Sequence, residues 1–134
     1  YLLKPNGTML VFSQGRPVGE IKPDSINPAI TAATNFFVTN DGFGGGSIFI
    51  VEMLSERIIQ VDKLTGKVIQ QIKVRADGDI RLNQLGSIFV DTSGSRAILY
   101  FVNGDQIIRA ELPSPPRPFR DESATPMPTT QVAP

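Results

Sequence analysis

Charged side chains gather at the two ends of the chain's central hairpin, and they could do acid–base chemistry. Glu52 and Glu56 precede the hairpin's first strand, and Asp62 and Lys63 follow it. Paired carboxylate and ammonium groups can exchange protons with a substrate. Charges at the ends of strands are more commonly solvated, so these four residues alone predict no active site.

Several catalytic classes are excluded by residue types that the sequence lacks. It contains no His and no Cys. Ser-His-Asp and Cys-His catalysis therefore cannot be built within this sequence, and neither can imidazole or thiolate metal sites. The glycine-rich run 42–46 precedes Ser47, but it has no Lys and leads into a strand, so it does not match a phosphate-binding loop. Asp77-Gly78-Asp79 resembles the start of a calcium loop but lacks the later spaced Glu, which favours an ordinary solvated loop.

Charge and hydropathy exclude two kinds of partner. Thirteen basic and thirteen acidic residues give a net charge of zero, so we expect no nucleic-acid partner. No apolar run approaches the ~20 residues that span a bilayer, so we expect no direct membrane insertion of this segment.

The chain is organised around a hairpin over residues 56–73. Two runs rich in β-branched residues flank a turn whose Gly66 suits a positive φ. The first run, 57–61, has counterparts at 8–12 and 106–110, and both steps are 49 residues. A fixed period of this size is typical of repeat architectures.

The repeat predicts an all-β fold of nine strands grouped as two, four and three. The expected strands are 8–13, 18–22, 30–39, 47–53, the two strands of the hairpin, 85–90, 97–102 and 106–112. Four antiparallel strands per repeat indicate the blades of a partial β-propeller over residues 1–112; a nine-stranded sandwich or meander is the alternative. We expect the core to contain Phe37, Phe49, Ile50, Phe89, Leu99 and Phe101.

Residues 113–134 form a second region, rich in Pro, Ser and Thr. Such a composition cannot bury enough apolar area to fold alone. We expect an extended Pro-rich C-terminal tail that runs over a neighbouring surface. Phe119 would be its apolar anchor, flanked by Arg117 and Arg120, and these three residues are the predicted partner-binding site.

The repeats resemble those of the NHL, YVTN and lactonase-like β-propellers. Residues 86–94 followed by 97–102 and 106–109 match the family's strand, Asp-containing turn, aromatic-rich strand and next strand. Residues 62–69 resemble its Asp-x-x-Thr-Gly-Lys-Val hairpin. The resemblance spans residues 6–112, or about two to two and a half blades, and implies a propeller fold.

The same resemblance suggests a calcium site. Residues 37–41 look like the strand end that supplies Asn and Asp ligands in calcium-dependent lactonases of the paraoxonase type, which implies Asn40 and Asp41 as ligands. Glu52 or Asp91 could add to them, since calcium takes six or more oxygens. The family's other ligands and its catalytic His have no counterpart here, and a plain Asn-Asp-Gly turn explains the same residues.

These observations favour a non-catalytic propeller module that binds proteins or serves as a structural subunit. The alternative is a fragment of a calcium-dependent lactonase or hydrolase of the propeller type. Because the sequence starts at Tyr1 within what reads as a repeat, we expect a processed or partial chain. Its partners would be other protein subunits or further blades of its own chain. The tail resembles the stalks of secreted or surface-anchored bacterial proteins, so we expect an extracytoplasmic location or membrane association through another segment.

Overall fold

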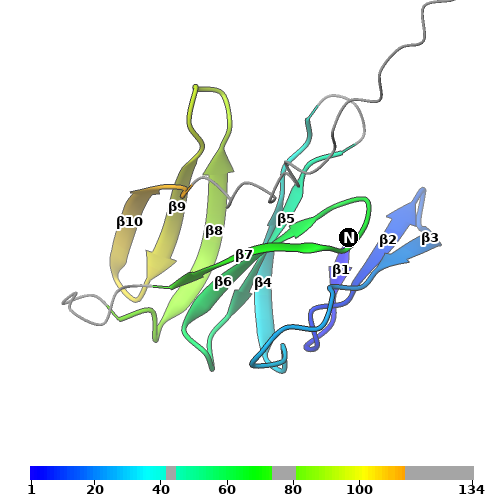
Figure 1. Cartoon of the computed structure of the whole chain (residues 1–134), viewed down its shortest axis with the longest axis horizontal. Helices are drawn as coiled ribbons and strands as arrows, with labels where there is room; N and C mark the ends of the chain where they lie inside the picture. Colours follow the sequence, from blue (N-terminus) through cyan, green and yellow to red (C-terminus); the bar gives the residue numbers. More distant parts are fainter. Residues whose placement is uncertain (42–44, 74–80, 114–134) are drawn as a thin grey trace, which may run out of the picture.

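The computed structural model describes residues 1–41, 45–73 and 81–113. These residues form ten strands in three antiparallel sheets and contain no helix, which confirms the all-β class. Figure 1 shows the sheets side by side in chain order. Sheet A contains β1 (Leu2–Leu3), β2 (Met9–Ser13) and β3 (Arg16–Ile21). Sheet B contains β4 (Ala33–Val38), β5 (Ser47–Glu52), β6 (Arg57–Asp62) and β7 (Val68–Lys73). Sheet C contains β8 (Leu85–Asp91), β9 (Ile98–Asn103) and β10 (Gln106–Glu111).

The turn between β6 and β7 has the geometry that its residues predict. Gly66 adopts a φ of +77°, and a Cβ there would lie 2.3 Å from the carbonyl oxygen of Lys22. The Asp62 side chain accepts hydrogen bonds from the backbone N–H groups of Leu64 and Thr65. Side-chain bonds of this kind mimic a backbone turn and stabilise it locally.

The 49-residue period places three strands at equivalent positions. β2, β6 and β10 lie in different sheets, and each pairs with the strand before it in the chain. Relative to the four strands of sheet B, the described part of sheet A has no counterpart of β4, and that of sheet C has no counterpart of β7. The repeat predicts that these three strands lie in three separate sheets, and the structure places them so.

The strand grouping differs from the expected one in sheet A. Leu2–Leu3 pairs with β2 through Leu10 and Met9, so the described sheets have three, four and three strands. Two residues carry too little periodicity to mark a strand in the sequence. β4 also begins at Ala33 rather than Ile30, because the N–H groups of Thr31 and Ala32 donate to the Glu52 carboxylate instead of joining the ladder.

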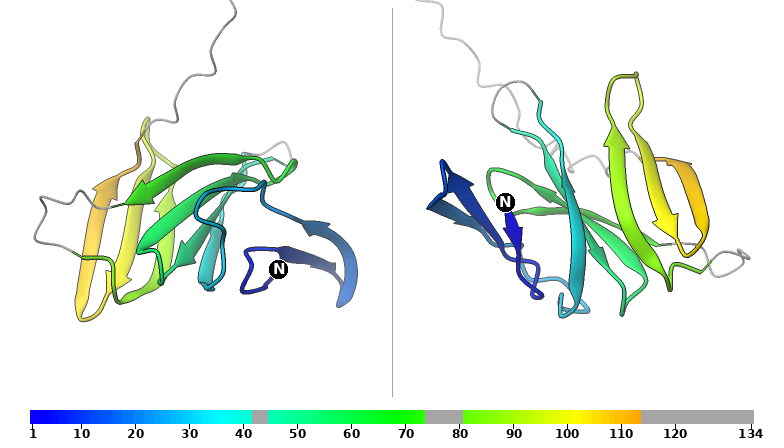
Figure 2. Two further views of the ribbon diagram at one scale, coloured as in Figure 1. Left: turned by 60° about the horizontal axis from the view of Figure 1, so that its bottom comes forward. Right: turned by 180° about the vertical axis from the view of Figure 1, so that it is seen from behind.

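Figure 2 shows sheet B between sheets A and C. A hydrophobic cluster lies on each side of sheet B, toward the neighbouring sheet. The cluster between sheets A and B contains Met9, Ile30, Ile48, Ile50, Ile59 and Val61. The cluster between sheets B and C contains Phe49, Val51, Ile58, Leu82, Leu85, Ile88, Val90, Leu99 and Phe101. Sheet B is therefore covered on both faces, which explains the unbroken apolar run of β5.

Two expected core residues are not among the fully buried ones. Phe37 is partly buried and packs against the cluster between sheets B and C. Phe89 is 52% exposed, although its ring packs edge-on against Phe37 with centroids 5.1 Å apart. Its neighbours Ile88 and Val90 point into the cluster instead, because successive residues of a strand face opposite sides.

Candidate functional site

The predicted calcium ligands lie in a hollow at one end of sheet B. Asn40 and Asp41 follow β4, and together with Thr39, Gly46 and Thr92 they line a hollow of about 330 Å³. The N–H of Asp41 donates to the carbonyl of Gly45 at 3.2 Å, which closes the turn. A Cβ at Gly45 would lie 2.3 Å from an Asp41 carboxylate oxygen, so Gly45 allows this close approach.

A lysine forms a hydrogen bond with one of the predicted calcium-binding oxygens. The Lys63 ammonium donates to Asn40 Oδ1 at 2.5 Å. A positive group bound to that oxygen repels a divalent cation and removes one of the few ligands on offer. The arrangement at Asn40 is therefore that of a polar contact between the end of β4 and the β6–β7 turn.

The two proposed additional ligands lie in different places. Glu52 is the last residue of β5, whereas the hollow lies near Ser47 at the start of β5, where Thr39 pairs with it. At ~3.3 Å per residue, the two ends of β5 are about 17 Å apart. Asp91 is the last residue of β8, next to Thr92, and its carboxylate accepts a hydrogen bond from the Ser93 N–H at 2.9 Å. The Ser93 hydrogen bonds hold the pKa of Asp91 below its ordinary value of 3.8. Among the described residues, no three His, Cys, Asp or Glu side chains cluster as metal ligands would.

The most developed polar cluster is buried. Glu52 and Arg57, a residue that the sequence does not single out, face each other across the β5–β6 hairpin, and both side chains are fully buried. Arg57 Nε donates to Glu52 Oε2 at 2.6 Å, and Nη2 lies 2.5 Å from the same oxygen. Its remaining donors reach Gln71 Oε1 and the carbonyls of Pro28 and Ala29.

The same cluster holds the loop that leads into β4. Glu52 Oε1 accepts the N–H of Thr31 at 2.7 Å and that of Ala32 at 3.4 Å. Burial raises the pKa of Glu52, but these hydrogen bonds and Arg57 outweigh it, so the pKa lies below the ordinary 4.5. With no solvent access and every donor of the pair engaged, the cluster positions the 28–32 loop rather than a substrate.

The sequence did not reveal this buried pair. The sequence predicts Glu52 as a solvated strand end or a calcium ligand, and it marks no role for Arg57. One signal could have found it, since a four-residue turn after β5 places Glu52 directly opposite Arg57 in a hairpin.

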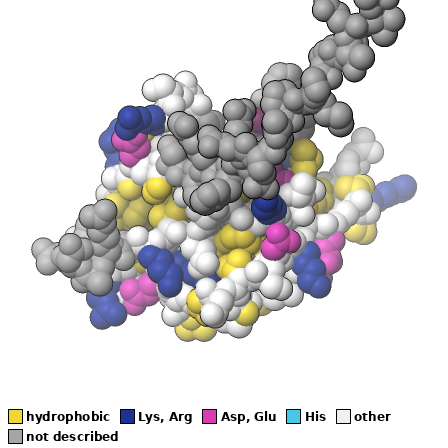
Figure 3. All heavy atoms as spheres, viewed as in Figure 1, with side chains coloured by type: hydrophobic (Ala, Val, Ile, Leu, Met, Phe, Trp, Pro, Cys, Tyr) yellow, Lys and Arg dark blue, Asp and Glu magenta, His cyan; other side chains and the backbone are white. Residues whose placement is uncertain are grey.

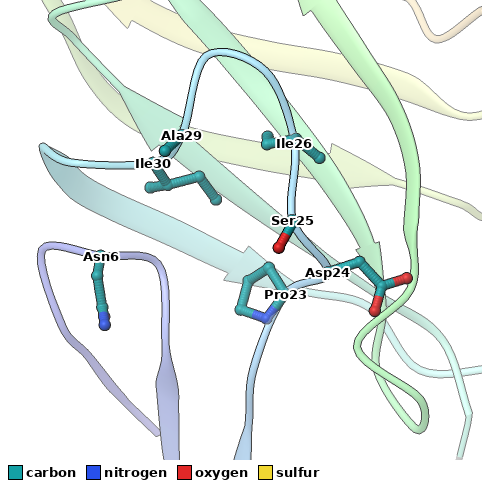
Figure 4. Close-up of a pocket in the computed structure, with 7 residues that line it drawn as sticks. All are labelled: Asn6, Pro23, Asp24, Ser25, Ile26, Ala29 and Ile30. Atoms are coloured by element: carbon teal, nitrogen blue, oxygen red, sulfur yellow. The ribbon is translucent and has the colours of Figure 1, made fainter.

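A second hollow lies between sheet A and the β3–β4 loop. Its volume is about 160 Å³, and its lining residues are Asn6, Pro23, Asp24, Ser25, Ile26, Ala29 and Ile30. In Figure 4, Asn6 lies across the hollow from Pro23, Ser25 and Ile30. The Asn6 side-chain oxygen Oδ1 already accepts a hydrogen bond from the Thr8 N–H at 3.1 Å. The hollow offers no concentration of charge that would select a ligand.

Large apolar side chains are exposed on the two flanking sheets. Ile107 on β10 is 79% exposed, Leu2 on β1 is 50% exposed, and Phe12 on β2 is 40% exposed. Figure 3 shows apolar side chains at the surface between charged ones. Contiguous exposed apolar patches are typical of surfaces that another protein covers.

The predicted partner-binding residues Arg117, Phe119 and Arg120 lie outside the described residues. The last described residue is Pro113, whose carbonyl accepts a hydrogen bond from Gln70 Nε2 at 3.0 Å. In the described part of the chain, no helix is long and apolar enough to cross a membrane.

Comparison of the chain with protein-family models, with curated proteins and with solved structures returned no match. The resemblance to NHL, YVTN and lactonase-like propellers therefore rests on the residues quoted above.

Proposed function

We propose that this chain is a non-catalytic β-propeller module that binds proteins or serves as a structural subunit of a larger assembly. The observation that carries the proposal is the exposed apolar surface on both flanking sheets, centred on Ile107 in sheet C and on Leu2 and Phe12 in sheet A. Burying a large aliphatic side chain contributes about 1.5–3 kcal/mol, so each face favours association.

The internal organisation supports the same proposal. Three antiparallel sheets follow one another in chain order (Figure 1). An apolar cluster is packed between each neighbouring pair. A propeller is built by extending such a stack until it closes, typically at four to eight blades. Further sheets, from this polypeptide or from other subunits, are the partners that this geometry favours.

The experiment compares complexes formed by tagged chains in extracts of the source organism. Wild type, Ile107→Asp, Phe12→Asp and the control Leu64→Asp would be expressed at the native level. Leu64 is 70% exposed and lies in the β6–β7 turn, so it belongs to no strand of either flanking sheet. We expect wild type and the control to migrate in a complex larger than the 14.6 kDa chain, and the two face variants to lose it. A wild-type chain that migrates alone would contradict the proposal.

The hollow at Asn40 and Asp41 is the one observation that favours the alternative, a fragment of a calcium-dependent lactonase or hydrolase. It brings both residues close to Thr92, in the turn that contains Asp91. The Lys63 contact to Asn40 weighs against it. Calcium-dependent hydrolysis of a lactone that is lost in Asp41→Ala would establish this alternative.

A further inference from the structure

Sheets A and C each have an outer face, which points away from sheet B. Equivalent residues of the three repeats show how these outer faces relate to the interfaces within the molecule. Met9, Ile58 and Ile107 occupy the same position of β2, β6 and β10. Met9 is 1% exposed because it packs toward sheet B, and Ile58 is 0% exposed because it packs toward sheet C. Ile107 points away from sheet B and has no described sheet to pack against. The outer face of sheet C therefore continues a series of interfaces that the molecule already forms twice.

The opposite face of each sheet forms a second series. Ile59 packs toward sheet A, and Ile108 packs toward sheet B. Their equivalent in sheet A is Leu10, which points away from sheet B because its neighbour Met9 points toward it. The outer face of sheet A is thus equivalent to the faces of sheets B and C that pack against the preceding sheet.

Both outer faces carry the side chains that such an interface needs. On sheet C, Ile107 lies opposite Val102, and Arg109 lies opposite Tyr100, so these four share the outer face. On sheet A, Leu10 lies between Leu2 and Glu20, and Phe12 is two residues further along β2. The pairing of β2 with β3 shifts register between Val11 and Phe12, where Val18 of β3 is the extra residue. β2 itself has no inserted residue, so alternation puts Phe12 on the same face as Leu10.

The charges on the two faces are compatible. Arg109 stands beside the apolar residues of sheet C, and Glu20 stands beside those of sheet A. Glu20 contacts Lys4 at 3.6 Å, but both side chains are more than 40% exposed. Exposed pairs of this kind contribute little, so Glu20 can exchange Lys4 for a partner's arginine. The zero net charge adds no repulsion between copies.

We propose that the outer face of sheet C docks on the outer face of sheet A of a second copy of this chain. The inference rests on the proposed function and names its partner. The contact is head to tail, because it joins two different surfaces. Two copies with three sheets each give six sheets, which lies within the range at which propellers close, so two such contacts complete a ring.

The experiment measures the mass of the purified 134-residue chain in solution. Light scattering after size-exclusion chromatography, up to about 100 μM protein, would detect an interface of micromolar affinity. We expect twice the chain mass of 14.6 kDa for wild type and for Leu64→Asp. Ile107→Asp and Phe12→Asp should each give the monomer mass. Leu2→Asp provides a second variant of sheet A, and circular dichroism would verify that every variant is folded.

Mixing the two face variants tests the head-to-tail geometry. Ile107→Asp retains an intact sheet A, and Phe12→Asp retains an intact sheet C. An equimolar mixture should therefore recover a species of two chains through one unmodified contact. If Ile107→Asp alone still forms dimers, the contact does not depend on the outer face of sheet C, and the inference is wrong.

The outcome separates this inference from the proposed function. A purified wild-type chain that stays monomeric overturns the second-copy inference. If the same chain still enters a larger complex in source extracts, the proposed protein-binding function stands with a different partner. If it is monomeric in both settings, both proposals fail.

Discussion

Glu52 and Arg57 illustrate how two charges can be buried only as a pair. Each is fully buried, and each supplies the other's main counter-charge. Removing one partner leaves an uncompensated charge in a low-dielectric environment, which costs about 3–5 kcal/mol. We expect Glu52→Ala and Arg57→Ala each to lower the free energy of unfolding by this amount in urea denaturation.

The control is the exposed pair between Arg96 and Glu111 on sheet C. Glu111→Ala should change the free energy of unfolding by under about 1 kcal/mol, because solvent screens this pair. In the buried pair, the double variant should lose less than the sum of the single losses, with a coupling of about 1–3 kcal/mol. Additive losses would mean that Glu52 and Arg57 do not depend on each other.

The stability of the fold should depend on pH through the Glu52 carboxyl. Its pKa in the folded protein lies below the ordinary 4.5, because the hydrogen bonds from Thr31, Arg57 and Ala32 outweigh desolvation by burial. A lowered folded pKa contributes stability above the unfolded value, and that stability is lost as pH falls through the folded pKa. Hydrogen bonds from the Thr65 hydroxyl and N–H groups also lower the pKa of Asp62 below its ordinary 3.8. Asp62 therefore makes stability fall with falling pH in the same way.

We therefore expect a constant urea midpoint from pH 7 to about 5 and a decline below pH 4.5. The comparison variant is Glu52→Gln, which keeps the side-chain size and cannot titrate. It should be less stable at pH 7 and show a shallower decline in acid. An identical decline in the variant would assign the acid sensitivity to other carboxylates.

The Asn40 and Asp41 hollow gives a prediction about calcium. Lys63 donates to Asn40 Oδ1, and the two Glu52 oxygens are occupied by Arg57 and by the Thr31 and Ala32 N–H groups. The described oxygens therefore fall short of the six or more that calcium takes. We expect millimolar calcium to leave the melting temperature unchanged, since only binding to the native state would raise it. A saturable rise that Asp41→Ala abolishes, and that magnesium does not reproduce, would contradict this.

At the scale of elements, alternation within a strand decides which aromatic residues stabilise the fold. Phe49 on β5 is 1% exposed within the cluster between sheets B and C, whereas Phe89 on β8 is 52% exposed. Truncating a buried Phe costs about 3–5 kcal/mol. We expect this loss for Phe49→Ala in chemical denaturation.

Phe89→Ala is the matched comparison, since the same atoms are removed from an exposed site. Its loss should stay near about 1 kcal/mol, the scale of one edge-on ring contact such as that with Phe37. Equal losses in the two variants would mean that Phe89 is covered in solution, by another sheet or another chain.

Much of the strand arrangement could be predicted from the sequence, because the repeat carries it. The 49-residue spacing put β2, β6 and β10 at equivalent positions of three sheets, and Gly66 marked a turn with positive φ. The orientation of β8 could not be predicted in the same way. Its residues 88–90 are all apolar, and only the packed partner sheet selects Ile88 and Val90 as the inward pair.

The buried Glu52–Arg57 pair lay beyond sequence analysis for a different reason. Its burial depends on the 28–32 loop folding over β5 and β6, a contact between segments more than 20 residues apart. Charged residues are almost never fully buried unless paired, so the sequence favours a solvated Glu52 at the end of its strand. The calcium interpretation of Asn40 and Asp41 likewise could not anticipate Lys63, which comes from another hairpin.

At the scale of the whole molecule, the sheets form a series with two open ends. Sheet B is covered on both faces and contains the most buried strands, whereas sheets A and C each expose one apolar face. The stability of the outer sheets therefore depends on what covers them, because exposed aliphatic side chains contribute no burial energy. Association would stabilise β10 and β2 more than the already covered β6.

The last prediction concerns residues 114–134, which contain the expected partner-binding residues Arg117, Phe119 and Arg120. The two described core clusters and the residues packed on them lie between Leu3 and Leu112. Pro113 is held to β7 by its hydrogen bond from Gln70, so a chain that ends at Pro113 keeps this contact. We expect the truncated chain to keep its strand content and to unfold within about 0.5 kcal/mol of the full chain.

The tail should matter for association instead, since proline lowers the entropy lost when an extended segment binds a groove. Truncation after Pro113 should weaken co-purification of the chain with its partners, and Phe119→Ala in the full chain should reproduce part of that loss. Thr129→Ala is the control, because it alters a small tail residue outside the predicted anchor. Undiminished co-purification of every partner with the truncated chain would show that the tail is only a linker, and that association depends on the sheet faces alone.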